Sequence, residues 1–108
     1  MAQDYVVVKN TGVNNGRIAI NKSVFQAISE ITIKDIENVK AAEGKFAKPV
    51  TLKIDDNKLM IEADIKVAYG ANVNATCGLV QSKIYENIVF MTGYKPAEIT
   101  VNVIGFDI

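Results

Sequence analysis

The sequence predicts an α+β domain with the order β-α-β-β-α-β, in which a mainly antiparallel sheet carries both helices on one face. Two observations indicate this class. Residues 59–69 alternate apolar and polar side chains, as expected of a strand buried on one side. Residues 22–36 and 73–91 instead repeat apolar side chains every three or four positions, which is typical of helices. A right-handed crossover in each βαβ unit makes a ferredoxin-like topology possible.

The composition favours one folded domain. The chain has 108 residues, of which 49% are hydrophobic, and two prolines. We expect an N-terminal tail or edge strand over residues 1–15 and a single domain over residues 16–108. Twelve basic and twelve acidic residues cancel, so no long-range field should attract nucleic acid or an anionic bilayer. Without a recognisable signal sequence or a long apolar run, the protein is expected to be cytoplasmic.

The first elements should be a short strand and a helix. Residues 5–8 are rich in β-forming side chains, and the turn-forming residues 11–16 lead into the alternating segment 17–20. This pattern predicts a hairpin, or a loop, before the first strand. Asn21 is placed to cap a helix over about residues 22–36. The apolar residues at helical spacing are Val24, Ala27, Ile28 and Ile31.

A β-hairpin with a defined register follows a mixed connection over residues 37–48, part of which, 39–42, is expected to add to the sheet. If Asp56 and Asn57 form a two-residue turn with positive φ, every apolar residue of the first strand opposes an apolar residue of the second. The predicted pairs are Ile54 with Leu59, Leu52 with Ile61, and Val50 with Ala63. The predicted inward set of the long strand is Leu59, Ile61, Ala63, Ile65, Val67 and Tyr69.

A second helix and a last strand complete the domain. Asn72 can cap the helix, and Gly93 can end it in a left-handed conformation. The predicted buried stripe of this helix is Val73, Cys77, Val80, Ile84, Ile88 and Met91. The last strand is expected over residues 99–104, with Ile99, Val101 and Val103 pointing inward.

The strongest candidate for chemistry is the acidic pair Glu62 and Asp64 on the outward side of the long strand. Their separation of about 6.6 Å along a strand could hold a hard cation or support acid–base catalysis. Lys53 and Lys66 are close enough to neutralise both carboxylates on a flat sheet. A solvated surface is therefore the favoured interpretation.

Other motifs favour structural roles. The sequence Asp55-Asp56-Asn57 lacks the remainder of a calcium loop, and Gly12 and Gly16 do not have phosphate-loop spacing. Cys77 lies in a predicted buried stripe, and the chain has no histidine to activate it. We therefore expect no catalytic, cofactor-binding or metal-binding residues, and a protein that is not an enzyme.

The outward face of the sheet is the candidate protein interface. Its expected charges are two lysines, Lys53 and Lys66, against four carboxylates of Asp55, Glu62, Asp64 and Glu98, a net of −2. Apolar residues share this face by strand parity, and a cluster of them would mark an interaction site. The candidate interface comprises Met60, Glu62, Asp64, Lys66, Ala68, Ile104 and Phe106.

Five segments in order carry a family resemblance: Gly16-Arg17-Ile18-Ala19-Ile20 leading to Val24 and Ala27-Ile28, then Ile36-Glu37-Asn38-Val39, Val67-Ala68-Tyr69-Gly70, Met91-Thr92-Gly93 and Val101-Asn102-Val103. Together they resemble the alkaline shock protein family, the envelope-stress-response proteins common in Gram-positive bacteria. The resemblance spans residues 16–106. Asn38 stands where the family usually has glycine, and residues 41–48 hold fewer glycines than is usual.

The resemblance implies a non-enzymatic scaffold or interaction protein in the cell-envelope stress response or homeostasis. It also implies homo-oligomers and, in some members, retention at the inner face of the membrane by a separate membrane-embedded partner protein. The family offers no catalytic residues to transfer. The alternative is a small-molecule-sensing regulatory domain, because β-α-β-β-α-β modules often bind metabolites at dimer edges; this alternative rests on fold analogy.

Overall fold

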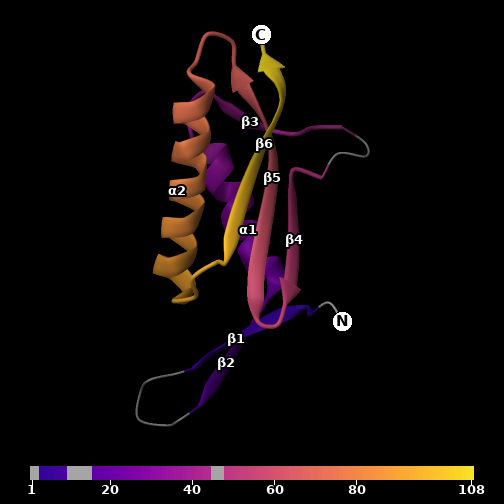
Figure 1. Cartoon of the computed structure of the whole chain (residues 1–108), viewed down its shortest axis with the longest axis vertical. Helices are drawn as coiled ribbons and strands as arrows, with labels where there is room; N and C mark the ends of the chain where they lie inside the picture. The colour runs from indigo at the N-terminus through magenta and orange to yellow at the C-terminus, as the bar shows by residue number, and fades with distance from the viewer. Residues whose placement is uncertain (1–2, 10–15, 45–47) are drawn as a thin grey trace.

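The computed structural model describes residues 3–9, 16–44 and 48–108. It confirms the α+β class, with six strands and two helices in the described residues. The molecule is elongated, about 52 × 25 × 18 Å, and a hairpin projects from one end of the main sheet (Figure 1). Most of the turn expected over residues 11–16, including Gly12, lies outside the described residues. The elements are β1 (Tyr5–Lys9), β2 (Arg17–Asn21), α1 (Lys22–Asp35), β3 (Val39–Ala41), β4 (Val50–Asp55), β5 (Lys58–Ala68), α2 (Val73–Thr92) and β6 (Glu98–Asp107).

The N-terminal hairpin corrects one expectation. Strands β1 and β2 pair antiparallel from Tyr5 opposite Asn21 to Lys9 opposite Arg17, which confirms a hairpin before α1. They form a separate two-stranded sheet, so β2 does not join the main sheet and the ferredoxin-like topology is not formed. The physical reason is local: β1 offers β2 a partner a few residues away, which closes a much shorter loop than pairing with a distant strand would.

Strand β5 is the centre of the main sheet. Along one edge β4 pairs antiparallel with its first half and β3 with its second half, and β6 pairs in parallel along the other edge. The predicted hairpin register is confirmed from Val50 opposite Ala63 to Asp55 opposite Lys58. Asp56 and Asn57 have φ of 52° and 60°, as the two-residue turn requires. The expected addition of residues 39–42 to the sheet is confirmed by β3.

Both helices pack on one face of this sheet, as predicted. The inward side chains of β5 from Leu59 to Val67 are at most 1% exposed, and they pack with buried residues of α1 and α2. Tyr69 shares this face but is not buried: β5 ends at Ala68 and the chain turns at Gly70, so Tyr69 is 77% exposed. The sheet is therefore covered by helices on one side.

Helix α1 begins and ends as predicted but buries a different face. Val24, Ala27 and Ile31 are exposed, whereas Phe25 and Ile28 are buried. The remaining buried residues of α1 are Ser29, Thr32 and Ile33. The serine hydroxyl donates to the Phe25 carbonyl at 2.8 Å and the threonine hydroxyl to the Ile28 carbonyl at 2.7 Å. Because these bonds satisfy both hydroxyls, Ser29 and Thr32 can lie in the core. The spacing of apolar residues could not reveal this, so the predicted buried face of α1 was wrong.

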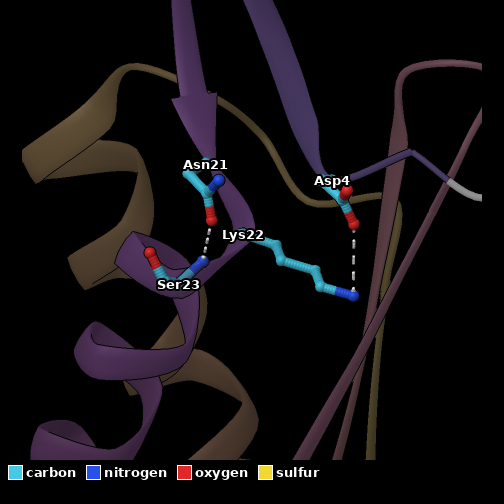
Figure 2. Close-up of polar contacts among 4 residues, drawn as sticks. All are labelled: Asp4, Asn21, Lys22 and Ser23. Carbon is cyan, nitrogen blue, oxygen red and sulfur yellow. Dashed lines mark hydrogen bonds and ion pairs between the residues drawn. The ribbon is translucent and has the colours of Figure 1, made fainter.

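The start of α1 is fixed by the residue that ends β2. The Asn21 side-chain oxygen accepts a hydrogen bond from the backbone N–H of Ser23 at 2.9 Å, which confirms the predicted cap (Figure 2). Nearby, the Lys22 Nζ lies 3.8 Å from the Asp4 carboxylate (Figure 2). Both side chains are well exposed, so this ion pair contributes little to stability.

Helix α2 is capped as predicted and is longer than the core that it covers. The Asn72 side chain accepts from the Ala75 N–H at 2.9 Å, and Gly93 ends the helix with φ of 75°. The central residues Val80, Ile84 and Ile88 are buried. The predicted stripe was wrong at its ends, where Val73 is 36% exposed and Met91 66% exposed.

Candidate interaction surface

The side of the main sheet opposite the helices is the candidate functional surface, and we call it the outer face. The register of β3 to β6 assembles it from residues that alternate with the buried ones. Its side chains are those of Lys40, Thr51, Lys53, Asp55, Lys58, Met60, Glu62, Asp64, Lys66, Ala68, Glu98, Thr100, Asn102 and Asp107. A shallow hollow of about 360 Å³ lies between β4, β5 and β6 on this face.

The acidic pair of the outer face is organised by an amide from the neighbouring strand. The Nδ2 group of Asn102 donates to Glu62 Oε1 at 3.1 Å and to Asp64 Oδ1 at 3.0 Å. The neighbouring lysines Lys53 and Lys66 form no ion pair with either carboxylate among the described residues. Because an amide carries no charge, the bridge holds both carboxylates in place without neutralising them.

The outer face as a whole is close to electrically balanced. The register adds Lys40, Lys58 and Asp107 to the charges expected from the sequence, which gives four lysines against five carboxylates and a net charge of −1 instead of −2. One of these lysines is paired, since Lys40 Nζ lies 3.3 Å from the Asp107 carboxylate. The face therefore offers local pairing sites of both signs and no strong field.

A β-bulge corrects the position of Phe106. The register of β6 shifts between Ile65 and Lys66, so that Gly105 opposes Lys66 and Phe106 opposes the buried Val67. Residues directly opposite each other share a face, so Phe106 lies on the helix side and not on the outer face. Its ring meets Tyr69 edge to face at 6.2 Å and 81°. Ile104 is the inserted residue and is 53% exposed.

The other candidate residues from the sequence, Cys77 and the turn at Asn57, make contacts that support the fold. Cys77 packs against the core from α2 and is half-buried. Asn57 in the β4–β5 turn accepts from the Val7 N–H at 2.7 Å and donates to the Val7 carbonyl at 3.1 Å, which attaches the N-terminal hairpin to the main sheet. No cluster of three or more metal-binding side chains occurs within residues 3–9, 16–44 and 48–108.

Two features of the surface were not found from the sequence. One is the bridging role of Asn102, which depends on the parallel register of β5 and β6. That register follows a 20-residue helix and has no local turn signal that could fix it. The other is the edge of β6 that faces away from β5. The apolar residues Ile104 and Phe106 of β6 could have indicated this edge, but strand parity alone assigned both to the outer face.

The helices of the described residues include none that is long and apolar enough to cross a membrane.

Comparison with known proteins identifies a family. Residues 10–108 match the alkaline shock protein 23 family, which is described as having a cell envelope-related function. The chain is also similar to the uncharacterised protein YqhY of Bacillus subtilis (strain 168), with 22% identity over an alignment that covers 83% of this chain and 76% of that protein.

Proposed function

The chain belongs to the alkaline shock protein family, whose function is cell envelope-related, and from this premise we propose that it is a non-enzymatic scaffold of envelope stress response or homeostasis. It acts in the cytoplasm by self-association and by binding a membrane-associated partner protein through the outer face. One observation carries the proposal: helices seal one side of the sheet and leave the other as an ordered, exposed surface.

The outer face has chemistry suited to a protein partner. The Asn102 amide holds the Glu62 and Asp64 carboxylates through one hydrogen bond to each, so a lysine or arginine of the partner meets a preformed acceptor pair. Met60, half-buried beside this pair, supplies a flexible apolar contact. A nearly neutral surface of this kind gives specific local pairing and little attraction to phosphate polymers.

The same residues support a role without catalysis. The whole chain has no histidine, and its one cysteine packs into the core stripe of α2. The carboxylates of the outer face stand on an open sheet, where water has free access, and not in a pocket that could tune an acid and a base apart. Binding is the activity that this surface can perform with the groups it presents.

Membrane fractionation of the cells that natively produce the protein tests the proposal. Wild-type protein should sediment with the membrane fraction, and the double variant Glu62→Lys/Asp64→Lys should move to the soluble fraction. A matched control with the same charge change, Asp35→Lys/Glu37→Lys, alters exposed residues outside the outer face and should behave as wild type. Wild-type protein absent from the membrane fraction, or equal behaviour of the two double variants, would refute partner binding through this face.

Binding of the purified chain to protein-free lipid vesicles is the second part of the experiment. The purified chain should not bind them, because the proposed attachment is to a protein and the net charge of the chain is zero. The sensing alternative is separated by thermal-shift screening with metabolites. A ligand at about a hundred times its dissociation constant stabilises a protein by about 2.7 kcal/mol. Such a shift, combined with no membrane sedimentation, would favour the sensing domain.

A further inference from the structure

We propose that the open edge of β6 pairs antiparallel with β6 of a second copy of this chain, around a two-fold axis at Val101. The inference rests on the proposed function, because it specifies the surface through which the protein self-associates. It differs from the outer face, which stays free in this arrangement. The edge in question is the side of β6 that faces away from β5.

Backbone hydrogen-bonding groups point outward along this edge. The Ile99 carbonyl accepts from the Gln81 side chain of α2 at 3.1 Å, so it faces away from β5. Backbone groups of alternate residues in a strand point to the same edge, and Val101 and Val103 therefore face the same way. Within the described part of the chain, β5 is the strand with which β6 pairs, and none pairs with its far edge.

Two of the common protections against strand addition, lysine and proline, are absent from this edge. Strand β6 has 10 residues, contains no lysine or proline, and carries charges only at its ends, Glu98 and Asp107. Proteins normally blunt long edge strands with such residues. Ile99, Val101 and Val103 remain partly exposed although their neighbours on β5 are buried. Their uncovered surface is available to a further strand.

The occupant that fits this edge is β6 itself. When Val101 opposes Val101 of the second copy, Ile99 opposes Val103 of that copy on the helix side, and Thr100 opposes Asn102 of that copy on the outer side. Apolar residues then meet apolar residues, polar meet polar, and no like charges stand directly opposite within residues 99–103. The Ile99 carbonyl keeps a second lone pair for the new bond.

The two ends of β6 are complementary as well. Phe106 and Tyr69 form an exposed aromatic pair on the helix side near the end of β6. A groove of about 410 Å³ lies between α2 and the beginning of β6. Its lining residues are Gln81, Ser82, Tyr85, Glu86 and Pro96 to Ile99. Antiparallel pairing about Val101 brings the end of one β6 beside the beginning of the other, so each Phe106 ring reaches the groove of the second copy.

Site-directed cross-linking tests the register. In a Cys77→Ala background, Val101→Cys places two thiols opposite each other at the axis, with Cα atoms about 5.5 Å apart, which suits a disulfide. The control Val103→Cys places its two thiols four residues apart along the strands, about 13 Å, which is too far. Mild oxidation should give a covalent dimer with Val101→Cys and none with Val103→Cys.

Sedimentation and light scattering test the contacts. Val101→Pro removes an N–H that does not bond to β5, so the fold should persist while the dimer dissociation constant rises at least tenfold. Phe106→Ser changes no backbone group and should weaken the dimer in the same direction. Circular dichroism and thermal unfolding verify that each variant is folded. Should Val101→Pro fail to fold, Phe106→Ser and the cross-link decide the question.

The outcomes separate this inference from the proposed function. Oligomers that persist in Val101→Pro and Phe106→Ser, with no covalent dimer from Val101→Cys, would overturn the β6 edge and leave self-association intact. A wild-type chain that stays monomeric at millimolar concentration would overturn both. Dimers that are lost in the variants and trapped by Val101→Cys alone would establish the edge as the interface.

Discussion

Removing one oxygen atom from Tyr94 should destabilise the fold by about 1–3 kcal/mol. The Tyr94 hydroxyl accepts from the backbone N–H of Leu59 at 2.7 Å and donates to the Asn57 carbonyl at 2.8 Å. Leu59 is fully buried, so Tyr94→Phe leaves its N–H without a partner, and a buried unsatisfied donor costs about that much. The Asn57 carbonyl is at the surface, where water can replace the lost bond.

The size of the effect sets the assay. An unfolding entropy of about 2.1 cal/mol/K per residue gives about 0.23 kcal/mol/K for this chain, so each kcal/mol lowers Tm by about 4 °C. Tyr94→Phe should therefore lower Tm by about 4–13 °C in calorimetry. The matched control is Tyr85→Phe, because Tyr85 is 40% exposed and lies on the surface of α2. Equal Tm values for the two variants would refute the role of the Tyr94 hydroxyl.

Five further substitutions test the assignment of faces and of left-handed positions, each by chemical denaturation. Ile61→Asp should cost several kcal/mol because it buries an unpaired carboxylate, whereas Glu62→Ala on the outer face should change stability by less than about 0.5 kcal/mol; equal costs would show that the faces are wrong. Gly93→Ala should cost about 1–2 kcal/mol, because the residue that ends α2 has φ of 75° although its surroundings leave room for a Cβ. Asn38 has φ of 67°, so Asn38→Ala should cost about 1–2 kcal/mol while Asn38→Gly causes no loss, and a loss with glycine would contradict the strain argument.

The parts of the fold that the sequence predicted correctly depend on local chemistry. Asp56 and Asn57 tolerate positive φ, and that turn alone fixes the register of β4 against β5. Asn21 and Asn72 offer side-chain oxygens at the first turn of each helix, where free N–H groups need acceptors. Asn38 explains one departure from the family pattern, since it adopts the left-handed conformation for which glycine is the usual residue.

The parts that failed depend on which distant elements meet. The buried face of α1 includes Ser29 and Thr32, whose hydroxyls are satisfied within the helix and so do not appear as core residues in a hydrophobic pattern. The face of Phe106 depends on a bulge in a parallel pair, and no turn residue announces it. Likewise, β2 pairs with β1 and not with a strand of the main sheet. Strand propensity does not say which of two available strands is the better partner.

Dimerisation through the β6 edge should strengthen partner binding by the outer face, whereas partner binding is not needed for the dimer. A two-fold axis that pairs β6 with β6 keeps the helices of both copies on one side of a continuous sheet, so both outer faces point the same way. A partner that meets two outer faces at once binds with an effective concentration that a single face does not provide. Val101→Pro should therefore release the protein from the membrane fraction although Val101 lies off the outer face, whereas Glu62→Lys should release it and leave the dimer intact. Dimer loss in Glu62→Lys would show that the two surfaces are one.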